Sequence, residues 1–279
     1  MYDIQFREND VTALDTATGL TEKGADSPGA FVVPMHASAI TEVMIGAVGD
    51  YTADAAHNFL AAVRLTGPGL NAPESWLIGP AGSTDGAAAT TAGMGGTDNI
   101  KRYVCNIPVV KGQRINAYGF MHGSADCGSI RVGVWLVFDG PVKGNAKYYD
   151  YREGDSAAAN TPVTITGRGG IAEGDFDVGS GTICDVAVVV SNCPVAGPLA
   201  ALTLHKFSGN GLVVAGDYEF AGNGLFTQDD ITISGTSWTS TGIDYKTSIS
   251  TKNGAIRVQV QEIEDDVGTP THGVCLGFL

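Results

Sequence analysis

Short apolar segments recur along the whole chain and are separated by turns rich in Gly, Asn, Asp and Ser. Several alternate apolar and polar residues, as half-buried antiparallel strands do, and Ile256, Val258 and Val260 form the clearest such face. The pattern predicts strands over residues 40–48, 61–66, 101–110, 114–120, 130–138, 161–166, 182–190, 199–207, 231–234, 245–250, 255–263 and 273–278. Many short strands joined by turns favour a β-sandwich or barrel over βαβ units.

Helical periodicity is scarce. Residues 51–60 are the one candidate for a helix, and this segment is short enough to be a loop instead. Pro162 restricts the strand predicted over 161–166 to the edge or the start of a sheet, because proline cannot donate to a ladder. The sequence therefore predicts an all-β protein.

The pattern repeats once, at a period of about 140 residues. Residues 40–45 (ITEVMI) resemble residues 183–188 (ICDVAV) 143 positions later, and 67–70 (GPGL) resemble 209–212 (GNGL) 142 positions later. Further matches follow in the same order, namely Tyr103, Ile107 and Gly112 with Tyr245, Ile249 and Gly254, then residues 133–138 with 273–278. This period is far longer than the roughly 20–50 residues of solenoid or propeller units, so each copy is interpreted as a domain.

The repeat divides the chain into four parts. Residues 1–30 are polar and weakly periodic, which predicts an N-terminal arm, and residues 140–160 are a polar, turn-rich linker. The two sandwich domains are then expected at 31–139 and 161–279. Each has a long Gly-rich insertion, at about 68–99 and 213–241, whose bland residues favour contacts over catalysis.

Composition and charge exclude several classes of protein. Hydrophobic residues make up 43% of the 279, enough for a sizeable core, and no apolar run approaches the length of a membrane span. Lys and Arg total 16 against 30 Asp and Glu, a formal net charge of −14. So acidic a chain is not expected to bind nucleic-acid phosphates directly.

The cysteines predict a reducing compartment. Cys105, Cys127, Cys184, Cys193 and Cys275 are odd in number and contain no CxxC pair, so buried free thiols are expected. Cys184 and Cys193 are the two most able to approach each other across a turn. The N-terminal residues lack the pattern of a secretory signal, which fits synthesis and assembly in the cytoplasm.

No catalytic motif stands out. The histidines have no metal-ligand spacing, GxSxG is absent, and the runs at 93–96 and 167–170 are interpreted as turns because neither belongs to a phosphate-binding motif. The histidines stand at His36, His57, His122, His205 and His272. The chain is therefore expected to be non-enzymatic and to need no cofactor.

Two acidic clusters and two tryptophans remain as candidate sites. The clusters are Asp229 with Asp230, and Glu262, Glu264, Asp265 and Asp266. Their oxygens suit Ca²⁺, but no DxDxDG loop is present, so the metal content stays unknown. Trp76 and Trp238 fall in the two insertions and are candidates to anchor an interface, whereas Trp135 is expected in the core.

Two tandem β-domains of this size, with long loops at matching places and a polar arm, resemble the double jelly-roll major capsid proteins of tailless icosahedral viruses. The resemblance covers about residues 31–279 and implies trimers with pseudo-hexagonal outlines, in a virion assembled in the host cytoplasm. The loops would form towers or subunit contacts, and other capsid or membrane proteins would be partners. A jelly roll has eight strands, of which about six are recognisable in each copy.

Two other functions remain open. Long loops carrying Trp76 and Trp238 are compatible with a carbohydrate-binding or host-recognition protein, such as a spike or fibre. A hydrolase built on a β-sandwich would need clustered Asp, Glu or His in a cleft, with paired carboxylates around a sugar ring in the case of a glycosidase.

Overall fold

The computed structural model describes residues 3–50, 57–84, 100–123, 129–139, 144–155, 161–191, 200–214, 218–226, 241–264 and 271–279. All regular elements in these ranges are β-strands. The described residues contain no helix long and apolar enough to cross a membrane. Of the predicted helix at 51–60, residues 57–60 begin a strand instead, and the rest lies outside the described ranges.

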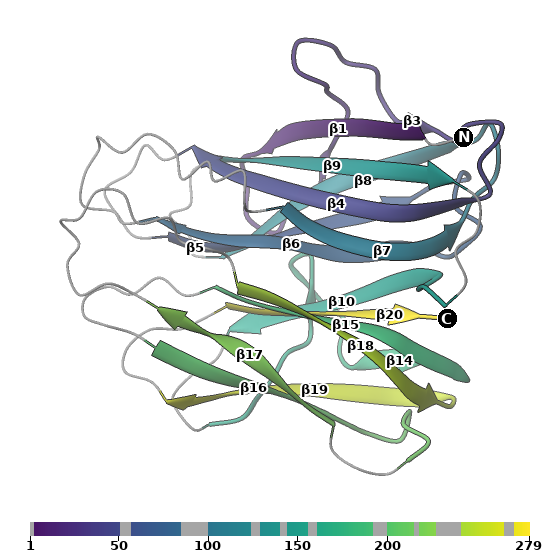
Figure 1. Cartoon of the computed structure of the whole chain (residues 1–279). Coiled ribbons are helices and arrows are strands. Elements are labelled where there is room, and N and C mark those ends of the chain that lie inside the picture. The colour runs from purple at the N-terminus through teal and green to yellow at the C-terminus, as the bar shows by residue number, and fades with distance from the viewer. Residues whose placement is uncertain are drawn as a thin grey trace.

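The first half of the chain forms two facing antiparallel sheets (Figure 1). Their strands are β1 (Asp3–Val11), β2 (Thr18–Gly19), β3 (Phe31–Val32), β4 (Ala39–Asp50), β5 (His57–Thr66), β6 (Ser75–Thr84), β7 (Ile100–Pro108), β8 (Arg114–Gly123) and β9 (Ser129–Asp139). One sheet has the order β1-β9-β4-β7 and the other β2-β8-β5-β6, with β3 beside β8.

The second half repeats this arrangement. Its strands are β10 (Tyr148–Asp155), β11 (Val163–Thr164), β12 (Gly167–Arg168), β13 (Ile171–Ala172), β14 (Phe176–Val178), β15 (Gly181–Ser191), β16 (Ala200–Ser208), β17 (Tyr218–Phe226), β18 (Thr241–Thr251), β19 (Gly254–Glu264) and β20 (Thr271–Phe278). The orders are β10-β20-β15-β18, extended by β12 and β13, and β11-β19-β16-β17, with β14 beside β19.

The strand orders of the two halves are equivalent position by position, which confirms two related, tandem antiparallel β-sandwiches of jelly-roll type. Local irregularities repeat as well. The pairing register shifts between Ile40 and Glu42 in β4, and between Ile183 and Asp185 in β15. These β-bulges lie 143 positions apart, in the segments whose sequences match.

The matching GPGL and GNGL segments form equivalent turns. Gly67 and Gly209 have φ values of +115° and +129°, which residues other than glycine rarely adopt. Two residues further on, the amide of Gly69 donates to the carbonyl of Arg114 at 2.8 Å, and that of Gly211 to Ala255 at 2.9 Å. The glycines are therefore required by a turn that both copies share.

Strands also form in segments predicted to have other roles. β1 lies in the predicted arm, pairs along its whole length with β9, and is an edge strand of its sheet. β10 begins in the predicted linker and pairs with β20. β6 and β17 lie in the two predicted insertions. Together with the short β2, which also lies in the predicted arm, these four strands bring each sandwich to eight principal strands.

These four strands were missed because their sequences break the apolar pattern. β1 and β10 are rich in charged residues, and β6 and β17 contain Gly, with Pro in β6 and Asn in β17. A strand with charged side chains is stable when those charges find partners in neighbouring layers, which local sequence does not show. The predicted strand at 231–234 lies outside the described residues.

Buried residues form two cores. One core lies in the second sandwich, and the other fills the first sandwich and continues into β10, β15 and β20 of the second. Side chains alternate between the cores along β15, where Ala187 and Val189 belong to the shared core and Val186 and Val188 to the second. A strand covered on both faces explains why this segment reads as a continuous apolar run.

Candidate functional site

The surface between the two sandwiches brings together several buried polar groups of the described chain. We call this surface the seam, defined as the contact between the β2-β8-β5-β6 and β10-β20-β15-β18 sheets, the two middle layers of the stack in Figure 1. Tyr149 and Tyr151 of β10 point across it into the shared core. The Tyr149 hydroxyl donates to the carbonyl of Val104 at 3.2 Å, and the Cys275 thiol to that of Trp76 at 3.0 Å.

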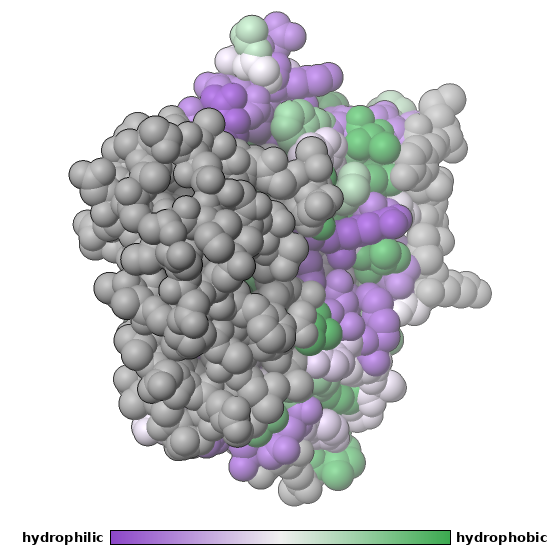
Figure 2. All heavy atoms as spheres, turned by 60° about the vertical axis from the view of Figure 1, so that its left-hand side comes forward, coloured by the Kyte–Doolittle hydropathy of each residue, from purple (hydrophilic) through white to green (hydrophobic). Residues whose placement is uncertain are grey.

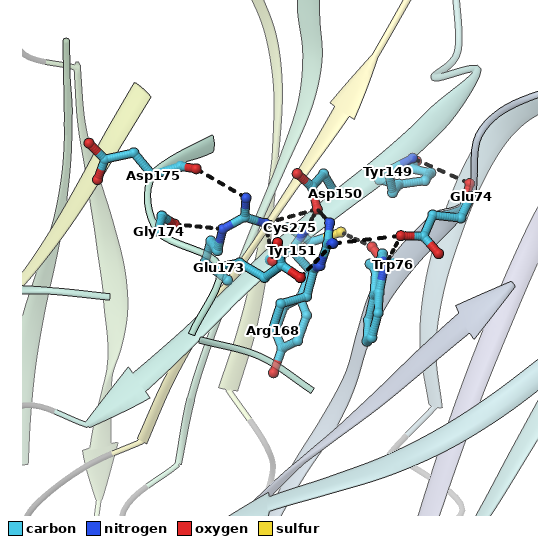
Figure 3. A network of polar contacts seen from close by, with 12 residues as sticks. Glu74, Trp76, Tyr149, Asp150, Tyr151, Arg168, Glu173, Gly174, Asp175 and Cys275 are labelled. Atoms are coloured by element: carbon cyan, nitrogen blue, oxygen red, sulfur yellow. Dashed lines mark hydrogen bonds and ion pairs between the residues drawn. The ribbon is translucent and has the colours of Figure 1, made fainter. Parts of the chain in front are cut away.

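A charged network surrounds Arg168 at one edge of the seam (Figure 3). Its guanidinium pairs with Asp150 at 3.1 Å and Glu173 at 2.9 Å in its own half, and with Glu74 of the first half at 3.7 Å. The same group lies over the Trp76 ring, 5.2 Å from its centroid. Burial works to lower the pKa of Arg168, but the carboxylates around it raise the pKa above its ordinary value. Arg168 therefore connects the two halves by charge and by stacking.

Trp76 lies in β6 at the centre of this edge. It is 3% exposed, its ring packs on Phe120 and Tyr151, and its Nε1 donates to Glu74 at 3.0 Å. Its contacts join the two sandwiches of one chain, and its buried ring offers no face to a sugar. Trp238 lies outside the described residues. Trp135, expected in the core, is half-buried and stacks on Phe6 with centroids 4.5 Å apart, because side chains alternate along β9 and its ring points to the face opposite the core.

Each β-bulge carries a buried acid that pairs with a basic residue on the neighbouring strand. Glu42 in β4 is 8% exposed and pairs with Arg102 of β7, and Asp185 in β15 is 3% exposed and pairs with Lys246 of β18 at 2.7 Å. Asp185 also accepts a hydrogen bond from Tyr149 at 3.0 Å. Burial raises the pKa of Asp185 despite these partners. The pairs are part of the repeated architecture, which argues for a structural role.

Three of the five cysteines lie within the described residues, and all are free and buried, as expected. They are Cys105, Cys184 and Cys275. Burial raises the pKa of each thiol, so these groups are protonated and unreactive at neutral pH. Cys127 and Cys193 lie outside the described residues, so the approach of Cys193 to Cys184 is not tested.

Two histidines meet inside the second sandwich. His205 and His272 are both fully buried, and Nδ1 of His272 lies 3.3 Å from Nε2 of His205. Burial lowers the pKa of His205 to about 3 and holds that of His272 well below its ordinary range, so both rings are neutral. His205 lies in strand β16, and its ring faces the core.

Asp15, His122 and Glu153 form the one group of three metal-ligating residue types found among the described residues, farther along β10 at the same edge of the seam. Their ligand atoms all lie within 4.8 Å of one another. His122 Nδ1 contacts Asp15 Oδ1 at 2.8 Å, and Asp155 lies 3.8 Å from Nε2. Burial works to lower the pKa of His122, whereas the hydrogen bond to Asp15 and the nearby carboxylates raise it above its ordinary value.

The backbone explains how these three residues meet. Tyr149, Tyr151 and Glu153 alternate along β10, so all three face the first sandwich. Asp15 has a φ of +54°, and its amide donates to Met121 at 2.8 Å, which places it beside His122. Sequence spacing does not reveal this group, because its members are 107 and 31 positions apart and Glu153 lies in the predicted linker.

The Gly-rich run at 167–170 is a turn, as predicted, and it completes this edge of the seam. Gly169 and Gly170 have φ values of +58° and +81° between paired β12 and β13, as in a tight hairpin. A side chain on Gly170 would overlap Asp15, and the Gly170 amide donates to Glu153 Oε1 at 3.1 Å.

The other sequence candidates do not join this site. Side chains of Glu262 and Glu264 lie outside the described residues although their backbone belongs to β19, and Asp229, Asp230, Asp265 and Asp266 are not described. His36 is exposed, and the His57 side chain is not described. The predicted Ca²⁺ site is therefore not tested by the described residues.

No family model matches the chain, and no curated protein matches it. Among solved structures, the major capsid protein P2 of bacteriophage PM2 is similar over 99% of this chain and 98% of its own, at 11% identity and a TM-score of 0.33. A Broad Bean Stain Virus structure matches over 86% and 76%, at 8% identity and a TM-score of 0.34. The tandem CBM22-1-CBM22-2 domain of Paenibacillus barcinonensis Xyn10C matches over 99% and 91%, at 9% identity and a TM-score of 0.24. Because these TM-scores are low, the fold assignment rests on this chain's own strand order.

Proposed function

We propose that this chain is a self-assembling shell protein, the major capsid protein of a tailless icosahedral virus, which forms trimers with six sandwiches each. The observation that supports this proposal is the duplicated strand order within one block that shares a core. Three such chains around a threefold axis would place six similar sandwiches in a ring. This arrangement is the pseudo-hexagonal unit of a double jelly-roll shell. The seam keeps each pair of sandwiches at one fixed angle, as tiling requires.

The outer face of the β1-β9-β4-β7 sheet offers a surface for subunit contact. Pairing places Phe6, Trp135, Met44 and the ion-paired Arg102 in one cross-strand row, and Ile100 and Val104 flank Arg102 on β7. Ile100 and Val104 are 46% and 37% exposed. Exposed apolar side chains gathered on one sheet face are typical of an interaction site.

Figure 2 shows the surface on one side of the molecule. In the part that is coloured and described, hydrophobic residues form small patches between hydrophilic ones.

The net charge limits the partners of such a shell. At −14, each chain repels nucleic acid, so contact with a genome would pass through another protein, a membrane or counter-ions. We therefore propose other capsid or membrane proteins as partners, and the virion, assembled in the host cytoplasm, as the location.

Assembly of the purified full chain tests the proposal. We expect light scattering and electron microscopy to show trimers and larger shells as concentration and salt are varied, because salt screens the repulsion between acidic subunits. A monomer at every concentration and salt would overturn the proposal.

A matched pair of variants tests the contact surface. The double variant Ile100→Glu and Val104→Glu places charges on the outer face and should stop assembly without lowering Tm. The control, Val213→Glu and Val214→Glu, makes the same change at residues of the second sandwich that are 50% and 62% exposed, and should assemble like the wild type. Assembly by the first variant would exclude the outer face as the contact.

No described residue favours the alternative functions. The burial of Trp76 removes one of the two aromatic residues that suggested carbohydrate recognition. A glycan array with saturable binding by the full chain, together with failure to assemble, would favour the alternative.

A further inference from the structure

We propose that Asp15, His122 and Glu153 bind a divalent transition-metal ion of the Zn²⁺ class, which fastens the seam at one edge. The proposal concerns the single chain and holds whether or not the chain forms shells. It rests on the mutual placement of three side chains and on two buried polar atoms without partners.

Glu153 is the central observation. Its side chain is 1% exposed, and although Oε1 accepts the Gly170 amide at 3.1 Å, Oε2 has no hydrogen-bond partner among the described residues. A buried carboxylate oxygen without a partner is strongly unfavourable. A cation bound at this oxygen would remove the penalty.

His122 presents a second open atom to the same place. Its Nδ1 is occupied by Asp15 at 2.8 Å, but the buried Nε2 has no hydrogen-bond partner, and Asp155 at 3.8 Å is beyond hydrogen-bond distance. Buried metal-binding histidines use one nitrogen for the metal and the other for a carboxylate or carbonyl. Asp15, whose side chain is 38% exposed, would turn away from Nδ1 to supply the third ligand, and water would take its place at Nδ1.

The donor set selects the type of metal. An imidazole nitrogen with two carboxylates suits Zn²⁺ and its neighbours, whereas Ca²⁺ and Mg²⁺ require shells of oxygen ligands. Three protein ligands leave a fourth position, which water would fill because this edge of the seam is partly exposed. We therefore expect Zn²⁺ or Co²⁺ to bind and Ca²⁺ not to bind.

The three ligands come from separate parts of the fold. Asp15 follows β1, His122 is in β8, and Glu153 is in β10 of the second sandwich. One ion would connect the N-terminal segment, a strand of the first sandwich and a strand of the second. Because binding would be specific to the folded chain, it would stabilise that chain against unfolding.

Tyr151 offers the competing explanation. Its buried hydroxyl also makes no hydrogen bond of normal geometry, yet burial, the charge of Glu153 and side-chain hydrogen bonding to Glu153 all raise the pKa of Tyr151. A small rotation that lets this hydroxyl donate to Glu153 would satisfy both groups without a metal. In that case the wild-type chain would not bind Zn²⁺ at this site.

The experiment uses the full chain, reduced and freed of metal by chelation. We expect calorimetry to show one Zn²⁺ per chain and Tm to rise with Zn²⁺, while Ca²⁺ leaves Tm unchanged. Co²⁺ should give a visible spectrum without thiolate charge-transfer bands, because no cysteine belongs to the site. Absence of Zn²⁺ binding by the wild type would overturn the proposal in favour of the Tyr151 explanation.

Three variants place the site. Glu153→Gln and His122→Gln should each weaken Zn²⁺ binding by about 100-fold or more, whereas His36→Gln, at an exposed histidine elsewhere, should bind like the wild type. If Glu153→Gln fails to fold, Asp15→Asn at the partly exposed position should still weaken binding by about tenfold or more. Wild-type affinity in both His122→Gln and Asp15→Asn would overturn the proposal.

Discussion

At the scale of single residues, burial decides the state of the ionisable groups in this protein. His205 and His272 are the clearest example, because both rings are fully buried and neither has an acidic partner. Each is neutral in the folded chain and would be protonated in the unfolded chain below about pH 6.5. The pair therefore makes stability depend on pH.

We predict a loss of stability as pH falls below about 6.5. The pKa of His205 drops from 6.5 to about 3 on folding, so between these values the unfolded chain binds more protons and the free energy of unfolding decreases. The slope is at most about 1.4 kcal/mol per pH unit for each histidine. Urea unfolding at pH 7, 6, 5 and 4 measures it.

The control for this prediction is a double variant that cannot titrate, His205→Gln with His272→Gln. Its unfolding free energy should fall less steeply between pH 6.5 and 4 than that of the wild type, while His36→Gln should follow the wild type. Equal slopes in the double variant and the wild type would contradict a buried, neutral pair.

At the scale of elements, central strands and edge strands differ in how well the sequence predicts them. β15 and β20 are covered on both faces and read as apolar runs, which made them easy to recognise. β1 and β10 are stabilised by partners in other segments. In β1, Arg7 lies over the Phe31 ring at 4.9 Å and donates to the carbonyl of Gly29 at 2.6 Å.

We predict that removing residues 1–11 destabilises the whole chain. The deletion removes β1, including the buried side chain of Val11 and the stack of Phe6 on Trp135. It also exposes the edge of β9, which can then pair with other chains and cause aggregation. Loss of the cooperative thermal transition in circular dichroism, or aggregation in gel filtration, is expected.

A shorter deletion is the control. Removing only residues 1 and 2, which precede β1, should leave Tm unchanged. If the longer deletion also leaves Tm unchanged, residues 3–11 behave as a detachable arm, as the sequence alone suggested, and the pairing with β9 contributes little to stability.

At the scale of the whole molecule, the seam makes one block of two sandwiches. The shared core includes Tyr149, Tyr151 and Cys275 of the second half, so neither half completes its buried surface alone. An ion pair between Lys101 and Asp244 at 2.7 Å adds a direct contact between the halves.

We predict that both sandwiches unfold in a single transition. Tryptophan fluorescence, which includes the environment of Trp76 at the seam, should coincide with circular dichroism of the whole chain. Trp76→Ala should lower the unfolding free energy by about 3–5 kcal/mol, because it empties a buried site that both sandwiches line. Two separated transitions in the wild-type chain would show that the seam does not couple the halves.

The sequence by itself determined the all-β class and the duplication. Apolar alternation and turn residues, including the GPGL and GNGL turns, are local features. Such features can be recognised without knowing which distant residues pack against them. It also indicated the buried thiols and the Gly169–Gly170 turn. The two sandwiches followed from these features, whereas the matching bulges became visible only in the pairing of the strands.

The tertiary structure alone decided what the seam contains. Trp76, Arg168 and the group of Asp15, His122 and Glu153 come together through contacts between segments that are far apart in the chain. Charged residues such as those of β10 read as a linker because their partners lie in other strands and turns. The physical reason is that burial and ion pairing arise when separate layers pack together. The spacing of residues along the chain does not show which segments will meet.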